Sequence, residues 1–292
     1  MAIAYLNGEF LPLDKARISP LDRGFLFADG IYEVIPAYRS VLFRLAEHLT
    51  RLQQSLDGIA LANPFSDQQW RDIFDTLLAK NGGGNLYIYL QISRGAPTKR
   101  DHAFPQPPVA PTVFAMTGQI AAPAADMPDN ASGVTAITLD DIRWSRCDIK
   151  SVALLANVLL REQAVREGAA EAILIRDGFA TEGAASNFFI VQQGTIISPP
   201  KSHLILPGIT RDLIIELAQQ HHMPVQEREI TKAELKAADE IWLSSSTKEV
   251  VPVVSLNGHN IGDGRPGPVW RRMAAHYVAF KRALCGADDE HQ

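Results

Sequence analysis

The sequence predicts an α+β protein with two domains. Its 292 residues exceed what one hydrophobic core usually takes in, so two lobes are the default expectation. Helix-like and strand-like segments occur in both halves, in a pattern that favours mixed, mainly antiparallel sheets. A stretch rich in Ala and Pro, QIAAPAADMPDNASG, separates the halves. We therefore expect an N-terminal domain over residues 1–120, a linker over 121–133 and a C-terminal domain over 134–292.

The first half begins with a hairpin signal. Asn7-Gly8 stands between two apolar runs, and both residues tolerate the positive φ that a tight turn requires. Further on, leucines recur at helical spacing, and Ser66 with Gln69 forms the capping-box pattern of a second helix. The other elements expected in this half are short strands over residues 25–45, helices over 45–59 and 66–81, and strands over 86–93 and 112–117.

The second half repeats the mixture of strands, hairpins and helices. Asp177-Gly178 predicts one hairpin turn, and Thr231 with Glu234 caps a short helix. An apolar run after Lys150 predicts a helix over residues 151–167. The other expected elements are a strand over 134–139, a hairpin-like pair over 187–200, a helix over 208–222, strands over 240–246 and 250–256, and a helix from about Val269.

The composition excludes several classes of function. The net charge is -5 and no basic run of five residues occurs, which argues against a nucleic-acid-binding face. The longest apolar stretches fall short of the roughly 20 residues that a membrane span needs. Residues 1–13 lack the pattern of a signal peptide. Cys147 and Cys285 offer neither a disulfide framework nor metal-ligand spacing, so we expect a cytoplasmic protein with reduced thiols.

Lys150 stands directly before an apolar run, Val152 to Leu160. A surface lysine at a helix start is the ordinary explanation. However, the residues that follow are too apolar for a solvated face, and the positive end of a helix dipole disfavours an ammonium group. Both effects favour a neutral, nucleophilic amine, which is what a Schiff-base lysine requires.

Glu182 lies in the segment GFATEGAASNFFIV, between a predicted strand and a turn of small residues. It could be an exposed turn glutamate. Alternatively, tight packing of small residues could place its carboxylate beside a flat ligand that approaches the backbone closely. A buried carboxylate needs a positive partner, and a protonated ring nitrogen would serve.

Three further segments could bind an anion. Gly208-Ile209-Thr210 opens a predicted helix, where free amides and a hydroxyl make an anion site. The run Ser244 to Thr247 supplies four consecutive hydroxyls after a strand. Arg51 lies on the apolar side of a predicted helix, either to meet an anion or to reach the surface with its head group. A helix cap and a polar turn are the ordinary explanations of the first two.

A long polar loop, RGAPTKRDHAFPQPPVAP, joins two predicted strands. Loops of this length inside a compact domain are uncommon and often functional. Arg100 and His102 are two residues apart, so in an extended loop they point to the same side. Together they would grip a carboxylate, although a solvated polar loop is the alternative.

Taken in order, these segments resemble the fold-type IV pyridoxal-phosphate enzymes. This superfamily includes branched-chain aminotransferases, D-amino acid aminotransferases and aminodeoxychorismate lyase. The similarity runs from about Tyr5 to Gly258, and the segments RCDIKS and TEGAASNFF are specific to the superfamily. The Arg-x-His loop is similar to that of D-amino acid (D-alanine) aminotransferases.

The resemblance implies a role for each matching residue. Lys150 would form the Schiff base with pyridoxal 5'-phosphate and carry the proton, and Glu182 would pair with the pyridine nitrogen. Phosphate ligands would be Arg51, Ile209, Thr210 and Ser246, and substrate contacts would be Tyr32, Arg100, His102 and Thr247. Because the Arg-x-His loop of these enzymes reaches into the neighbouring subunit, a homodimer is implied. The implied fold is a small α/β N-terminal domain and a larger C-terminal pseudo-barrel domain.

The implied reaction is transamination of a D-amino acid, D-alanine first, with 2-oxoglutarate, to give a 2-oxo acid and D-glutamate. A branched-chain L-aminotransferase, an aminodeoxychorismate lyase, an (R)-amine transaminase and a non-catalytic cofactor-binding protein remain as alternatives. The sequence departs from the family at Ala184-Ala185, where relatives often carry serines, and at Ser246, where relatives carry a threonine. Asp101, inside the Arg-x-His segment, would orient its neighbours. No spacing reveals the side-chain preference of the substrate pocket.

Overall fold

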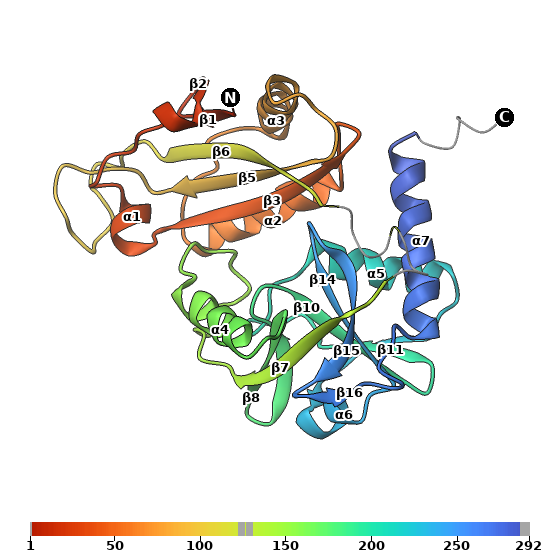
Figure 1. Cartoon of the computed structure of the whole chain (residues 1–292). Coiled ribbons are helices and arrows are strands. Elements are labelled where there is room, and N and C mark those ends of the chain that lie inside the picture. The colour runs from red at the N-terminus through yellow and green to blue at the C-terminus, as the bar shows by residue number, and fades with distance from the viewer. Residues whose placement is uncertain (1, 122–125, 127–130, 287–292) are drawn as a thin grey trace. The chain divides into compact units, whose positions relative to one another are not determined.

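The computed structural model describes residues 2–121, 126 and 131–286, which form two compact units (Figure 1). The first unit comprises residues 1–120 together with 149–154, and the second comprises residues 121–148 and 155–292. Most of the linker expected over residues 121–133 lies outside the described residues. None of the described helices is long and apolar enough to cross a membrane.

The first unit is an antiparallel sheet with two long helices on one face. The sheet order is β2-β1-β6-β5-β3-β4. The strands are β1 (Ile3–Leu6), β2 (Glu9–Pro12), β3 (Gly30–Tyr38), β4 (Val41–Leu42), β5 (Leu86–Ser93) and β6 (Thr112–Gln119), and the helices are the 3-10 turn Leu13–Lys15, α1 (Arg23–Phe27), α2 (Leu45–Gly58) and α3 (Asp67–Lys80).

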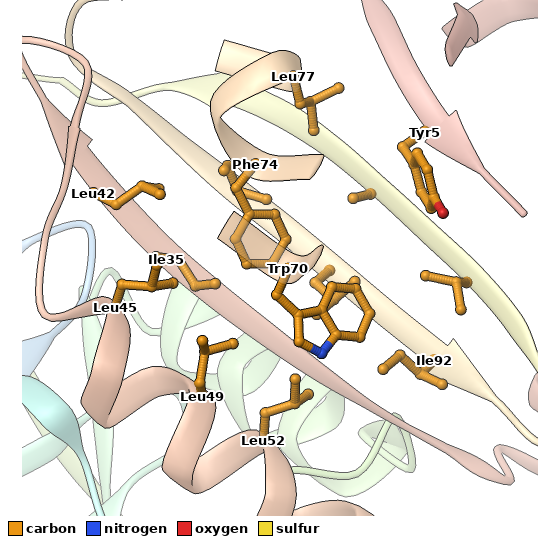
Figure 2. Close-up of a cluster of buried hydrophobic side chains, with 14 of the residues drawn as sticks. Tyr5, Ile35, Leu42, Leu45, Leu49, Leu52, Trp70, Phe74, Leu77 and Ile92 are labelled. Atoms are coloured by element: carbon orange, nitrogen blue, oxygen red, sulfur yellow. The ribbon is translucent and has the colours of Figure 1, made fainter. Parts of the chain in front are cut away.

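Strand periodicity divides the two faces of this sheet. Ile31 and Ile35 of β3 pair with Ile92 and Ile88 of β5, and all four are fully buried against α2 and α3. Figure 2 shows this cluster, with Trp70 and Phe74 of α3 at its centre and the leucines of α2 along one side. The opposite face carries half-buried polar and aromatic residues, among them Tyr32, Tyr89 and Gln91.

An open strand edge in the first unit determines where Lys150 lies. β4 pairs only with the end of β3, at Ala37 and Tyr38. The start of β3 is therefore open on that side, and residues 150–152 occupy it. The Tyr32 amide donates to the Lys150 carbonyl at 2.9 Å, and the Val152 amide donates to the Gly30 carbonyl at 3.1 Å.

The second unit is a mixed sheet, most of whose pairs are antiparallel. The order β12-β11-β10-β14-β15-β7-β8-β9-β13 contains parallel pairs at β11–β12, β15–β7 and β7–β8. Helix α4 packs on β7 and β8, whereas α5 and α7 pack together and against β14. The bounds are β7 (Val134–Asp140), α4 (Leu155–Arg166), β8 (Glu171–Arg176), β9 (Phe179–Gly183), β10 (Asn187–Gln192), β11 (Thr195–Ser198), α5 (Ile209–Gln220), β12 (Val225–Glu227), β13 (Ile230–Thr231), α6 (Lys232–Lys236), β14 (Glu240–Ser245), β15 (Glu249–Leu256), β16 (His259–Asn260) and α7 (Pro268–Leu284).

Most predicted elements are confirmed, and two are wrong. The hairpins at Asn7-Gly8 and Asp177-Gly178 form, and both capping boxes are present. The helix expected over 151–167 begins only at Leu155, because residues 150–152 pair with β3. The strand expected at residues 25–27 is instead part of α1, whose first turn is capped by the Asp22 carboxylate.

Candidate active site

Lys150 lies on the polar, aromatic face at the edge of the first sheet. Its Nζ is 4.1 Å from the centroid of the Tyr32 ring, and its amide donates to Ser55 Oγ of α2 at 3.2 Å. The side chain is half-buried, and the ring face attracts the ammonium form. The expectation of a helix dipole at Lys150 is wrong: α4 begins five residues later, and dipole effects fall off within one turn.

The apolar run after Lys150 is less buried than its composition suggests. Leu160 and Ala164 pack on the second sheet, but Leu155, Val158 and Leu159 of α4 are more than half exposed. The run therefore predicts a helix that is apolar on two faces, of which this chain covers one.

Two tyrosines form the wall beside Lys150. The rings of Tyr32 and Tyr89 lie 5.8 Å apart, and the Tyr89 hydroxyl donates to Gln91 Oε1 at 2.8 Å. Burial, and then the neighbouring Tyr32, raises the pKa of Tyr89 to about 12. The Tyr89 phenol therefore stays protonated and can only lose its proton at strongly alkaline pH.

Arg51 is buried and paired, so the alternative in which it reaches the surface is wrong. Its Nε and Nη2 donate to the two Glu33 oxygens, each at 2.8 Å, and His48 Nδ1 lies 2.8 Å from Glu33 Oε2. Burial acts to raise the pKa of Glu33, but the charge and hydrogen bonds of Arg51 hold it well below its usual range. Sequence reasoning missed Glu33, although it stands in step with Ile31 and Ile35 on a buried strand face.

Arg100 and His102 meet on one aromatic ring, as their spacing predicts. The Arg100 guanidinium lies 4.7 Å from the Phe27 ring centroid, and the His102 ring lies 5.0 Å from it. Both side chains are exposed. The loop that carries them joins β5 to β6 and lies beside α1 (Figure 1). Asp101 orients the loop backbone, since its Oδ1 accepts from the Ala103 amide at 3.1 Å.

A buried arginine that sequence reasoning missed holds this loop. Arg23 donates to three consecutive carbonyls, those of Asp101 at 2.5 Å, His102 at 3.0 Å and Ala103 at 3.1 Å. Its Nε donates to Asp29 Oδ2 at 2.7 Å. The same oxygen accepts from Arg94 at 2.8 Å, and the Arg94 guanidinium stacks 3.6 Å from the Phe104 ring centroid. The loop backbone is thereby fixed from Asp101 to Phe104.

In the second unit, Glu182 is buried, so the exposed-turn alternative is wrong. Its Oε1 accepts from Arg143 Nη1, and its Oε2 accepts from Asn187 Nδ2 and from the Leu206 amide, each at 3.0 Å. Burial raises the pKa of Glu182 to about 7, although Arg143 and the Leu206 amide act against it. A carboxyl group that titrates near neutrality can share a proton with a ring nitrogen.

The first turn of α5 is free of side-chain caps. Gly208 is its N-cap, and Ile209 and Thr210, the next two residues, are buried. A Cβ on Gly208 would lie 1.9 Å from Asn187 Oδ1, so only glycine allows this close approach. Uncapped amides and the dipole of a 12-residue helix make this end a site for an anion.

The hydroxyl run lies on the strand next to Asn187. Ser244 of β14 pairs with Asn187 of β10, and the Ser244 Oγ is buried without a hydrogen-bond partner among the described atoms. Ser246 and Thr247 follow in a half-buried turn. Asn187 also donates to the Leu206 carbonyl at 2.9 Å, which ties Glu182 to the segment that leads into α5.

The two units thus hold different parts of the predicted site. The first places Lys150 on Tyr32, Arg51 on Glu33, and Arg100 with His102 on Phe27. The second gathers Glu182, the Ile209–Thr210 turn and the Ser244–Thr247 run around Asn187. These residues fit pyridoxal 5'-phosphate, because a carboxyl group of raised pKa suits the pyridine nitrogen, and an uncapped helix with an unsatisfied hydroxyl suits a phosphate.

One departure from the family is explained by the fold. Ala184 is buried in a core cluster with Ile137, Leu160 and Leu174, so its methyl group packs where a hydroxyl would need a partner. Arg143 and Asn187 were also missed from the sequence. The signal for Asn187 is its position as a polar residue at the start of the apolar strand NFFIV.

Known proteins match this chain over most of its length. The family model "Amino-transferase class IV" matches residues 30–256. The D-alanine aminotransferase of Staphylococcus epidermidis is 41% identical over 280 residues, which cover 96% of this chain and 98% of that protein. The D-alanine aminotransferase of Listeria monocytogenes is 36% identical and covers 96% of each.

Solved structures with this fold include branched-chain amino acid aminotransferases. The Escherichia coli enzyme has a TM-score of 0.87 at 26% identity, over 99% of this chain and 96% of that one. A thermophilic relative given as "T.th.", complexed with N-(5'-phosphopyridoxyl)-L-glutamate, has a TM-score of 0.85 at 27% identity over the same shares. These matches confirm the predicted α+β fold, with a small α/β N-terminal part and a larger C-terminal pseudo-barrel.

Proposed function

The chain belongs to the class IV aminotransferase family, and from that premise we propose that it transfers the amino group of a D-amino acid, D-alanine first, to 2-oxoglutarate. The products would be a 2-oxo acid and D-glutamate. Aminotransferases of this fold type depend on pyridoxal 5'-phosphate, and the residues described above fit it. The observation that carries the choice of an amino acid substrate is the Arg100–His102 pair, presented on Phe27 by a fixed loop.

The chain's own residues would divide the work as follows. When bound, pyridoxal 5'-phosphate supplies an electron sink for the substrate Cα. Lys150 would hold the cofactor covalently and, once displaced by the substrate amine, move the proton at Cα. Glu182 would pair with the pyridine nitrogen, and Arg143 and Asn187 would hold its carboxyl group in place. The phosphate would be bound by Arg51, by the amides of Ile209 and Thr210, and by the hydroxyls of Thr210 and Ser246.

The substrate carboxylate would be bound by Tyr32, Arg100 and His102, with Thr247 as a further contact. We propose that the enzyme is a homodimer, in which the Arg100–His102 loop of one copy serves the other copy. Two features support a partner copy: the exposed apolar face of α4, and the exposed Phe25 and Phe104 beside the loop. The free thiols of Cys147 and Cys285 fit a reducing compartment, so the cytoplasm is the proposed location.

A substrate panel tests the proposal. The purified enzyme is assayed with D-alanine, L-leucine and (R)-1-phenylethylamine, each with 2-oxoglutarate, and the product glutamate is resolved by chiral chromatography. We expect D-alanine to react fastest and to give D-glutamate. Faster turnover of L-leucine would favour a branched-chain aminotransferase, the activity that the solved neighbours carry. Faster turnover of the amine would favour an (R)-amine transaminase.

A release of the amino group without an acceptor would favour a lyase, for which pyruvate formation is the readout. A protein that binds the cofactor but shows no spectral change with any donor would be a non-catalytic binder. Each of these outcomes contradicts D-amino acid transamination, so the panel separates all the alternatives.

A further inference from the structure

The turn that carries Ser246 and Thr247 contains an unfavourable backbone conformation. Three residues join β14 to β15, and Ser245 pairs with Glu249 across the turn. Hairpins with three-residue loops commonly place a residue in the left-handed region where the turn rejoins the strand, and glycine is the usual choice. Here Glu249 takes that role, with φ of 58°. A glutamate gains nothing from this conformation, so its side chain must account for its presence.

The Glu249 side chain is fully buried and paired with the far end of the chain. Its Oε1 accepts from Lys281 Nζ at 2.8 Å. Lys281 lies in the last turn of α7, is only 8% exposed and also donates to Asp126 Oδ1 at 2.5 Å. A buried carboxylate that loses its cation is strongly disfavoured, so this ion pair holds Glu249 in place.

Helix α7 also contacts the other half of the anion site. It packs against α5, where the His276 ring stacks on the His221 ring with centroids 3.6 Å apart, and it packs against β14. A lysine in the last turn would also interact with the helix dipole, but the exposed Arg282 next to it meets that need. The burial of Lys281 and the left-handed Glu249 are together explained only by their contact.

We infer that Lys281 is a positioning residue for the cofactor phosphate. Through Glu249 it fixes the turn Ser246–Lys248, so that the Ser246 and Thr247 hydroxyls are presented in one conformation before the ligand arrives. The inference rests on the proposed function, in which this turn binds the phosphate. Without the ion pair, the turn samples other conformations and the phosphate must order it on binding.

The test compares two ligands that differ only in the phosphate. Apoenzyme is titrated with pyridoxal 5'-phosphate and with pyridoxal, and Kd is read from tryptophan fluorescence and the visible absorption of the bound ligand. In K281M we expect the Kd for pyridoxal 5'-phosphate to rise about tenfold. The Kd for pyridoxal should stay within about twofold, because pyridoxal does not use the turn. K281R, which keeps the cation, should recover most of the loss.

The matched control is R282M, which removes an exposed cation from the same helix turn and should leave both Kd values unchanged. If K281M does not fold, E249Q replaces it, with the same expected selectivity. Equal Kd ratios in the wild type and in a folded K281M or E249Q variant overturn the inference. The double variant S246A/T247V separates the two levels. If it keeps the preference for the phosphorylated ligand, the turn is not the phosphate site, and both the assignment and the inference fail. If it loses that preference while K281M and E249Q keep it, only the inference fails.

Discussion

At the scale of single residues, Glu182 is the group whose protonation the fold changes most usefully. Its carboxyl group is buried, and it accepts hydrogen bonds from Arg143, Asn187 and the Leu206 amide. Burial nevertheless raises its pKa to about 7, so the group is poised near neutral pH. A partner with a ring nitrogen of similar basicity can then share the proton instead of leaving a charge unpaired.

This raised pKa predicts how the stability of the apoenzyme depends on pH. The folded state binds the Glu182 proton more tightly than the unfolded state, so Glu182 lowers the free energy of unfolding as pH rises from 4.5 to about 7. In E182Q that loss is absent. We therefore expect the stability of E182Q relative to the wild type to increase over this window and to level off above pH 8. Urea denaturation at pH 5, 6, 7 and 8 measures it; a difference that is independent of pH would contradict the raised pKa.

Arg100 predicts a loss that depends on the substrate carboxylate. In R100M we expect kcat/KM for D-alanine to fall by roughly 30-fold or more, because a charge-assisted hydrogen bond is lost. The turnover of (R)-1-phenylethylamine, which has no carboxylate, and the Kd for pyridoxal 5'-phosphate should hardly change. Steady-state kinetics with both donors checks this.

The control is K99M, which removes an exposed cation one residue away and should behave like the wild type. An equal fall of cofactor affinity and kcat/KM in R100M would instead make Arg100 a structural residue or a phosphate ligand.

At the scale of elements, the short helix α1 works as a support for the substrate loop. Phe27 forms the platform under Arg100 and His102, and Arg23 gathers the loop carbonyls. Gly24 allows the helix to approach β5, since a Cβ there would lie 2.8 Å from Ser93 Cβ. The loop is thus exposed and yet held from below.

R23M should therefore imitate R100M in part. We expect KM for D-alanine to rise several-fold, while kcat and the Kd for pyridoxal 5'-phosphate stay near the wild-type values, because only the presentation of the loop changes. R17M, at an exposed arginine that bonds only to nearby carbonyls, is the control. A KM that stays at the wild-type value in folded R23M would show that the loop needs no such support.

The elements also show what sequence reasoning can and cannot reach. Local signals decide the Asn7-Gly8 hairpin and the Ser66 capping box, because the residues that make each contact are neighbours in the chain. The start of α4 was missed because residues 150–152 form hydrogen bonds with β3, more than 100 residues earlier, and this pairing overrides helix propensity.

The same distinction holds for the candidate site. Lys150, Glu182 and the Ile209–Thr210 turn attract attention because polar chemistry stands among apolar or small residues. Arg23, Arg143 and Lys281 do not, because each looks like an ordinary surface cation until its distant partner is known. Long-range partners of buried charges are what a single sequence conceals.

At the scale of the whole molecule, the proposed sharing of loops between two copies predicts complementation. K150A and R100M each damage one contribution to a site. If the Arg100 loop serves the neighbouring copy, a mixed dimer contains one intact site. Unfolding and refolding an equal mixture should then restore about a quarter of wild-type activity at low D-alanine, since half the dimers are mixed. Each variant refolded alone is the control, and an activity no higher than their average would contradict the sharing.

The account as a whole depends on the amine of Lys150. The most direct measurement is the transamination of D-alanine by K150A, with K236A, at an exposed lysine of α6, as the matched control. We predict that K150A loses both the visible absorption of the bound cofactor and at least about a thousandfold in turnover, whereas K236A keeps both. Wild-type turnover in folded K150A would contradict the account.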